Sequence, residues 1–195
     1  MIKTNITTYY PHHLILDYNK NIYIADYTEL TKNIAPKRFV EIFSPDPCSD
    51  NQYFCILNPN DLNVGNIIFD SSSFTYSNGK TKSQCESVSF PSVSTGQSWI
   101  LFTELKYSSK QLNNRNNLRK AIKQLYRTRY HYMLSNVFKR NENICYLIAS
   151  LPLQSEPFAN FSLTPSRLTT LKVKHNIILR LKNTIEIEND QFLLV

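Results

Sequence analysis

The chain has 195 residues, enough for one domain with a substantial core, and its hydrophobic fraction of 42% is ordinary for a globular protein. Only three glycines occur, which excludes the glycine-rich loops that hold the phosphates of ATP or of a dinucleotide. The formal charge of +7 at pH 7 favours an anionic partner, with nucleic acid first and a membrane surface second.

The opening residues, MIKTNITTYY, contain no apolar stretch of the kind that a secretory leader needs, and no apolar run reaches the length that spans a bilayer. We therefore expect a soluble, cytoplasmic protein with no membrane attachment. The spacing of the four cysteines matches neither a zinc site nor a redox pair, so we expect reduced and mostly buried thiols at Cys48, Cys55, Cys85 and Cys145.

The first third of the chain carries weak signals for secondary structure. Residues 1–20 are rich in Asn and Tyr and receive no assignment. Apolar residues recur over 28–42 behind a possible helix cap at Thr28, but Pro36 interrupts them, which predicts a short or broken helix. The segment YFCILN, 53–58, is predicted to be a short strand.

The rest of the chain gives clearer patterns. Strands are predicted at 66–70 with a possible extension to Tyr76, at 84–90 and at 98–106. A helix follows over about 115–137, because apolar residues recur there at helical spacing. Further strands are predicted at 143–153, 175–183 and 184–195. This order indicates a single domain over 1–195, of α/β or α+β class with a mixed sheet.

The end of the strand at 98–106 carries the triplet Glu104-Leu105-Lys106. Residues i and i+2 of a strand point the same way, so Glu104 and Lys106 share a face. A carboxylate there can hold Mg²⁺, and the lysine can position a water or steady a phosphate. Metal-assisted hydrolysis needs another acid, for which Glu86 and Asp70 are the candidates. The alternative is a solvated ion pair worth about 0–1 kcal/mol.

A second signal is the charge of the predicted helix and its flanks. Between Leu105 and Asn141 there is no Asp or Glu, whereas ten Lys and Arg occur. An ordinary exposed helix mixes signs, so this bias favours a phosphate-binding surface over a merely solvated face. The candidate nucleic-acid-binding residues are Lys110, Arg115, Arg119, Lys120, Lys123 and Arg127.

QCESVSF followed by WILFTELK resembles the PD-(D/E)XK nuclease superfamily, in which an acid begins one strand and an acid-x-Lys triplet ends the next. AIKQLYRT resembles the helix that follows the triplet, and NICYLIASLPL with HNIILRLKN resembles the later strands. The first acid of the family is usually Asp, whereas here it is Glu86, which leaves Asp70 open as a partner. The resemblance implies an α/β, restriction-endonuclease-like core over about 64–183, a central mixed β-sheet flanked by helices.

The resemblance also implies roles for individual residues. Glu86, Glu104, Lys106 and Gln124 would be catalytic, and Glu86, Glu104 and Asp70 would hold Mg²⁺ or Mn²⁺. The expected function is metal-dependent hydrolysis of phosphodiester bonds, with DNA favoured over RNA. The alternative is a catalytically inactive nucleic-acid-binding or protein-interaction subunit with the same fold. A homodimer and a larger complex are both open.

Overall fold

The computed structural model describes residues 1–195 and shows an α/β fold with two mixed sheets and three helices. The helices are α1 (Ile2–Tyr9), α2 (Asn114–Leu134) and α3 (Pro165–His175), with a short 3-10 turn, η1 (Gln111–Asn113), before α2. The first sheet has the strand order β1 (Leu16–Tyr18), β5 (Val64–Ile68), β6 (Ser87–Pro91), β7 (Ile100–Leu105), β8 (Cys145–Ser150) and β9 (Ile177–Leu181). The second has the order β11 (Leu193–Leu194), β10 (Thr184–Ile187), β4 (Phe54–Leu57), β2 (Ile22–Asp26) and β3 (Val40–Phe43).

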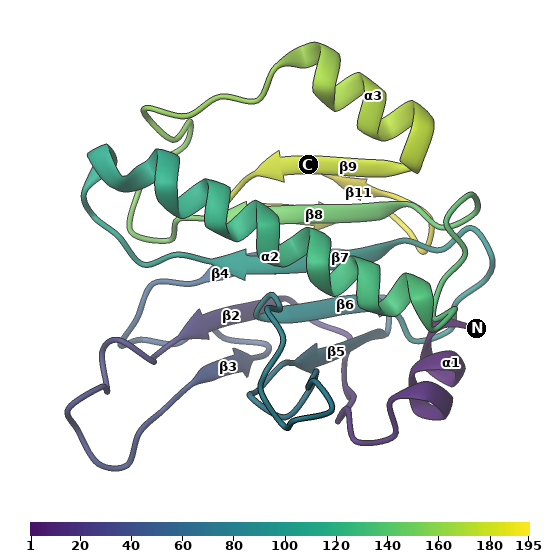
Figure 1. Ribbon diagram of the computed structural model, residues 1–195, viewed down its shortest axis with the longest axis horizontal. Helices are drawn as coiled ribbons and strands as arrows, with labels where there is room; N and C mark the ends of the chain where they lie inside the picture. The colour runs from purple at the N-terminus through teal and green to yellow at the C-terminus, as the bar shows by residue number, and fades with distance from the viewer.

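In the first sheet, the pairing of neighbouring strands changes from antiparallel to parallel at β7. Strands β1, β5, β6 and β7 pair antiparallel in that order, whereas β8 and β9 continue parallel to β7. Parallel neighbours need a crossover, and α2 and α3 supply the two crossovers on one face of the sheet. Figure 1 shows α2 passing in front of β7 and β8, with α3 beyond it near β9.

Two cores separate three layers. Leu118 and Leu125 of α2 pack with Val88, Phe102 and other side chains of the first sheet in one buried cluster. The opposite face of the same sheet packs against the second sheet in another cluster, to which Leu101, Leu105, Ile148, Ile24 and Ile56 belong. The central sheet is therefore covered on both faces, which explains why every residue of β6, β7 and β8 is buried.

Trp99, the only tryptophan, directly precedes β7 and lies in the core between the two sheets. Its side chain is fully buried, and the indole Nε1–H donates a hydrogen bond of 2.8 Å to the carbonyl of Asn189. Asn189 follows β10, so this contact joins the C-terminal segment to the first sheet.

Most strands and the long helix lie where the sequence predicts them, but three expectations differ. No helix forms over 28–42; turns lead into β3, which pairs antiparallel with β2, and Leu30 and Ile34 are exposed. The strand at 66–70 does not extend to Tyr76, because Asp70–Ser73 form a turn. The central sheet has helices on one face only, since the second sheet covers the other.

Two further observations concern the chain as a whole. All four cysteines are buried and unpaired, which confirms that expectation. None of the three helices combines the length and the apolar character that crossing a bilayer requires.

Candidate functional site

The acids of β6 and β7 meet where the two strands pair. Ser87 lies opposite Thr103, so the next residues outward, Glu86 and Glu104, face each other across the hairpin. Both project toward the α2 side of the sheet, as their neighbours Val88 and Phe102 do. The pairing of β6 with β7 thus brings Glu86, one of the two candidate partners, next to Glu104.

Glu104 and Lys106 form an ion pair at the end of β7, while Leu105 packs into the opposite core. The backbone N–H of Lys106 donates to the carbonyl of Ser150 at 2.9 Å, which fixes the end of the strand against β8. The side chain of Glu104 is fully buried, and its Oε2 has no hydrogen-bond partner. A buried, unpartnered carboxylate oxygen is costly and marks a place where a proton or a cation would bind.

The pKa values of both acids are raised. Burial raises the pKa of Glu104 to about 7, although the ammonium of Lys106 opposes the shift. Burial also raises the pKa of Glu86 well above its usual range, and the negative charge of Glu104 adds to the effect. Perturbed carboxyl groups close together are a common feature of sites that bind a cation or transfer a proton.

Asp26 is a third acid near this pair, and the sequence did not indicate it. It ends β2 in the second sheet, its backbone N–H donates to the Tyr107 hydroxyl at 3.1 Å, and its carboxylate accepts from the Thr28 N–H at 2.8 Å. Its charge raises the pKa of both Glu86 and Glu104. Asp26, Glu86, Lys106 and Lys120 line one pocket of about 490 Å³, which we call the acid pocket.

Asp70 has a different environment. Its carboxylate accepts hydrogen bonds from the Ser72 N–H, the Ser72 hydroxyl and the Ser73 hydroxyl at 2.8, 2.7 and 3.0 Å, which hold the turn after β5. These hydrogen bonds, led by that of the Ser72 hydroxyl, lower the pKa of Asp70. Asp70 lines a neighbouring pocket of about 730 Å³ together with Glu86, and its charge is not among those that shift the pKa of Glu86.

Gln124 lies on α2 above the same neighbouring pocket. Its Nε2 donates to the carbonyl of Gln84 at 2.8 Å, and its buried Oε1 has no partner. Thr128, one turn later, accepts a hydrogen bond of 2.7 Å from the N–H of Cys85. These two contacts attach α2 to the segment that leads into Glu86.

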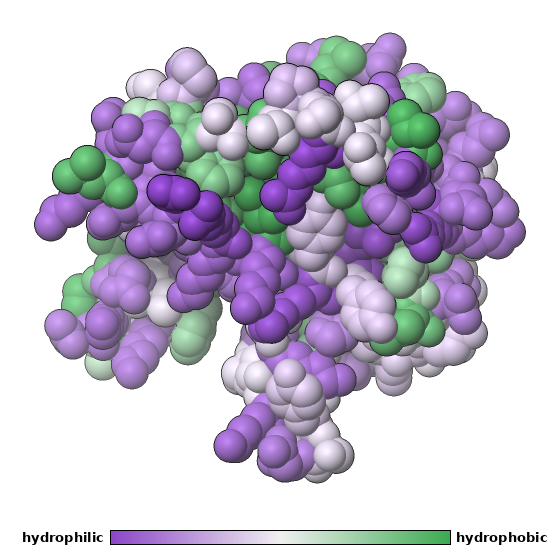
Figure 2. All heavy atoms as spheres, turned by 45° about the horizontal axis from the view of Figure 1, so that its top comes forward, coloured by the Kyte–Doolittle hydropathy of each residue, from purple (hydrophilic) through white to green (hydrophobic).

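The candidate phosphate-binding residues lie on or just before α2, and all six are exposed and free of ion pairs: Lys110, Arg115, Arg119, Lys120, Lys123 and Arg127. Figure 2 shows strongly hydrophilic side chains over this side of the molecule, with hydrophobic side chains visible between them. A row of unpaired cations is suited to a polyanion.

The donor set of the acid pocket has the right chemistry for a hard divalent cation. No three His, Cys, Asp or Glu side chains converge tightly enough to surround one metal ion. Mg²⁺, however, keeps several waters and needs only one or two carboxylates beside a substrate phosphate. Glu86, which lines the pocket, and Glu104, which is buried beside it, meet that lower requirement, and the unpartnered Oε2 of Glu104 supplies a free ligand atom.

No protein-family model, no curated protein and no solved structure matches this chain.

Proposed function

We propose that the chain is a metal-dependent nuclease that hydrolyses phosphodiester bonds, with DNA as its first expected substrate. The observation that carries the proposal is the meeting of Glu86, Glu104 and Lys106 at one end of β6 and β7. A buried acid, a half-buried acid and a lysine, beside a helix whose cations have no acidic partners, match the needs of phosphodiester chemistry.

The order of elements supports the same proposal. An acid stands before β6, the acid-x-Lys triplet ends β7, a helix follows, and β8 lies parallel to β7. This is the order that the resemblance to the PD-(D/E)XK superfamily implies, and we propose a restriction-endonuclease-like core on that basis.

Four charged residues in or beside the acid pocket have roles in the proposed reaction. A bound Mg²⁺ or Mn²⁺ would supply a more acidic water and offset charge on the phosphate. Glu86 and Glu104 would hold that cation with their carboxylates ionised. Lys106 would release Glu104 and turn its ammonium to the attacking water or to a phosphate oxygen. Lys120, which lines the pocket from α2, would contact the phosphate backbone.

Two roles from the resemblance change in the light of these contacts. Asp26 is better placed than Asp70 to act as a further acid, because it lines the acid pocket with Glu86 and Lys106. Gln124 bonds to Gln84, so we propose that it holds α2 over the site while its free Oε1 remains available to a water.

One observation favours a second candidate, a nucleic-acid-binding subunit without catalysis. Glu104 is already ion-paired with Lys106 through its Oε1, and no three ligands converge on one point. In that case the exposed cations of α2 would bind nucleic acid while the acids served only the fold.

The deciding experiment compares cleavage of supercoiled plasmid, single-stranded DNA and single-stranded RNA with Mg²⁺, with Mn²⁺ and with EDTA. Wild type should cut only with metal, and Glu104→Ala and Lys106→Ala should each lose at least about a thousandfold in rate, since each removes a group that acts on the reacting phosphate. Glu188→Ala, an exposed acid outside the pocket, is the matched control and should cut normally.

Two results would overturn the proposed nuclease activity or its assignment to the acid pocket. Salt-sensitive binding of DNA without cleavage under any metal condition, unchanged in Glu104→Ala, would leave the non-catalytic subunit. Cleavage that survives in both variants would mean that the acid pocket is not the site.

A further inference from the structure

A second pocket lies on the other side of α2 from the acid pocket. It has a volume of about 660 Å³ between α2 and the segment that begins α3, and it shares no lining residue with the acid pocket. We call it the α2–α3 pocket. Its size is in the range of pockets that hold small organic ligands.

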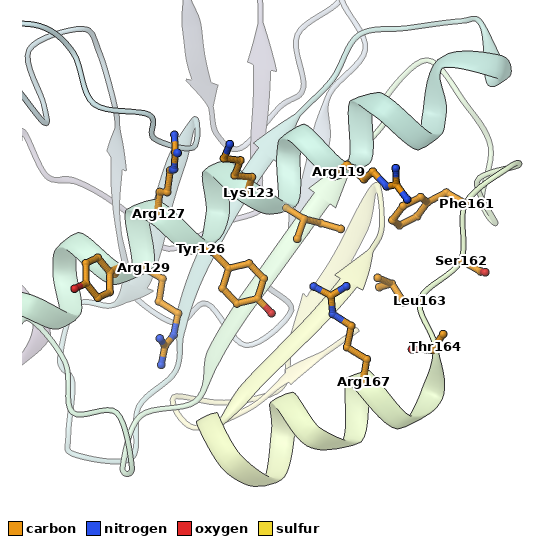
Figure 3. Close-up of a pocket in the computed structure, with 12 residues that line it drawn as sticks. Arg119, Lys123, Tyr126, Arg127, Arg129, Phe161, Ser162, Leu163, Thr164 and Arg167 are labelled. Carbon is orange, nitrogen blue, oxygen red and sulfur yellow. The ribbon is translucent and has the colours of Figure 1, made fainter.

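Every charged residue that lines the α2–α3 pocket is a cation. No Asp or Glu lines it, and none of its basic residues forms an ion pair: Arg119, Lys123, Arg127, Arg129 and Arg167. Figure 3 shows the side chains of Arg119 and Arg167 reaching the space between the helices, whereas Lys123 and Arg127 point away from α3.

Arg129 is the residue that most needs an explanation. Its side chain is 6% exposed, yet no carboxylate neutralises it. Its guanidinium donates to the His175 carbonyl at 3.4 Å, contacts the Met133 Sδ at 3.8 Å and lies 5.4 Å from the centre of the Phe138 ring. Its Nε has no partner. A buried cation with such weak compensation is costly unless an anion approaches it.

Tyr126 gives a second, independent sign of a missing ligand. Its hydroxyl is buried in the lining of the pocket and has no hydrogen-bond partner. Burial raises the pKa of this phenol, while the positive charges of Arg167 and Arg129 act in the opposite direction. In Figure 3 the phenol extends from α2 toward Arg167.

The start of α3 adds to the preference for an anion. Thr164 lines the pocket at the helix N-terminus, no side chain caps that end, and the first turn contains no acid. The positive end of the helix dipole therefore faces the pocket without compensation.

Aromatic rings narrow the kind of anion. Tyr126, Tyr130 and Phe161 line the pocket beside the arginines. Nucleic-acid bases stack on such rings, and one arginine guanidinium can donate two parallel hydrogen bonds to the oxygens of a phosphate. We infer that the α2–α3 pocket binds a nucleotide unit, with its phosphate on Arg119 and Arg167 and its base against the aromatic side chains, while Arg129 adds positive charge from the other end of the pocket.

The nucleotide has two possible sources with the same chemistry: a free mononucleotide, or one nucleotide of a single strand. The inference does not depend on the proposed nuclease activity, because the two pockets share no residue. Binding is therefore measured in EDTA, where cleavage does not occur.

The test is calorimetric titration with AMP, adenosine, inorganic phosphate and a short single-stranded oligonucleotide with or without a 5′-phosphate. AMP or the oligonucleotide should bind with saturation, and Arg119→Gln/Arg167→Gln should weaken that binding at least tenfold. Lys80→Gln/Lys174→Gln removes the same charge from exposed positions outside the pocket and should change affinity by less than twofold. Binding should persist in Glu104→Ala.

Tighter binding of AMP would identify a free mononucleotide as the ligand. Tighter binding of the oligonucleotide would identify one nucleotide of a single strand. Tyr126→Phe, which keeps the ring, should weaken binding less than the arginine variant, and melting curves verify that every variant is folded. Equal loss in the arginine variant and the lysine control, adenosine binding as tightly as AMP, or no saturable binding of any probe would each overturn the inference.

Discussion

The two sides of α2 use charge in opposite ways. On one side, Glu86 and Glu104 are crowded together with raised pKa values, and Lys106 is their nearest cation. On the other, Arg129 and Arg167 line a pocket that contains no acid. Both arrangements oppose stability in the isolated chain, one by crowding anions and the other by gathering cations.

This contrast indicates where ligands are expected to bind. Groups that the fold leaves uncompensated are costs that a bound partner can remove, a cation for the acid pocket and an anion for the α2–α3 pocket. A nucleic acid with its metal ions would supply both, since exposed cations of α2 line each pocket: Lys120 the acid pocket, and Arg119, Lys123 and Arg127 the α2–α3 pocket.

The largest expected effect is the salt dependence of DNA binding, which we assign to the cations of α2 and not to the rest of the surface. If about five of its cations contact phosphates, the affinity for duplex DNA falls several-hundredfold between about 50 and 200 mM salt. Lys120→Gln/Lys123→Gln should make the salt slope shallower by about 1.8, because two phosphate contacts are lost. Fluorescence anisotropy measures both. An unchanged slope in this variant, or the same change in Lys80→Gln/Lys174→Gln, would contradict the assignment.

The next effect concerns stability in the acid pocket. Because the pKa of Glu104 is about 7 in the folded chain, against an ordinary value of 4.5, the folded state keeps a proton that the unfolded state loses. The free energy of unfolding should therefore fall as the pH rises from about 4.5 to about 7, by about 3 kcal/mol for this group. Glu104→Gln should remove this contribution in urea titrations at several pH values and leave the part of the fall that the raised pKa of Glu86 causes. Glu188→Gln should keep the whole fall, and a flat wild-type profile would refute the prediction.

A smaller effect tests how α2 is attached to the acids. Thr128→Val leaves the buried N–H of Cys85 without its acceptor, so it should cost about 2 kcal/mol of unfolding free energy. Thr128→Ser keeps the hydroxyl and should lose much less. Denaturant unfolding compares them, and equal stability of the Val variant and wild type would show that the contact is unimportant.

The smallest expected effect decides which residue is the third acid of the site, Asp26 of the second sheet or Asp70 after β5 of the first. Asp26→Asn removes a like charge, so the pKa of Glu86 should fall toward its ordinary value. NMR titration with labelled glutamate measures it directly. Asp70→Asn is the control and should leave Glu86 unchanged; a larger shift in that variant would return Asp70 to the site.

The predictable part of the site is the part that local geometry determines. Glu104 and Lys106 share a face because strands have a period of two residues, and Glu86 meets Glu104 because adjacent strands pair. Asp26 was missed because it reaches the pocket from the second sheet, 60 residues before Glu86 in the chain. Nothing in a local pattern reports such a contact.

Two elements of the fold also differ from their prediction for reasons that lie outside the local sequence pattern. Helix α3 was missed because it buries no residue completely, so its apolar periodicity is weak. The apolar residues of 28–42 suggested a helix that does not form; Leu30, Ile34 and Phe39 are 54%, 60% and 64% exposed instead. Pairing of β3 with β2 decides that region, and this pairing is a tertiary effect.

The position of Trp99 gives the molecule an internal optical reporter. As the sole indole, it is fully buried between the sheets and bonded to Asn189, so its emission reports the docking of the C-terminal strands. Release of that segment should shift the emission to longer wavelength as water reaches the ring. Ligands that occupy either pocket beside α2 should leave the spectrum unchanged, because Trp99 lines neither one.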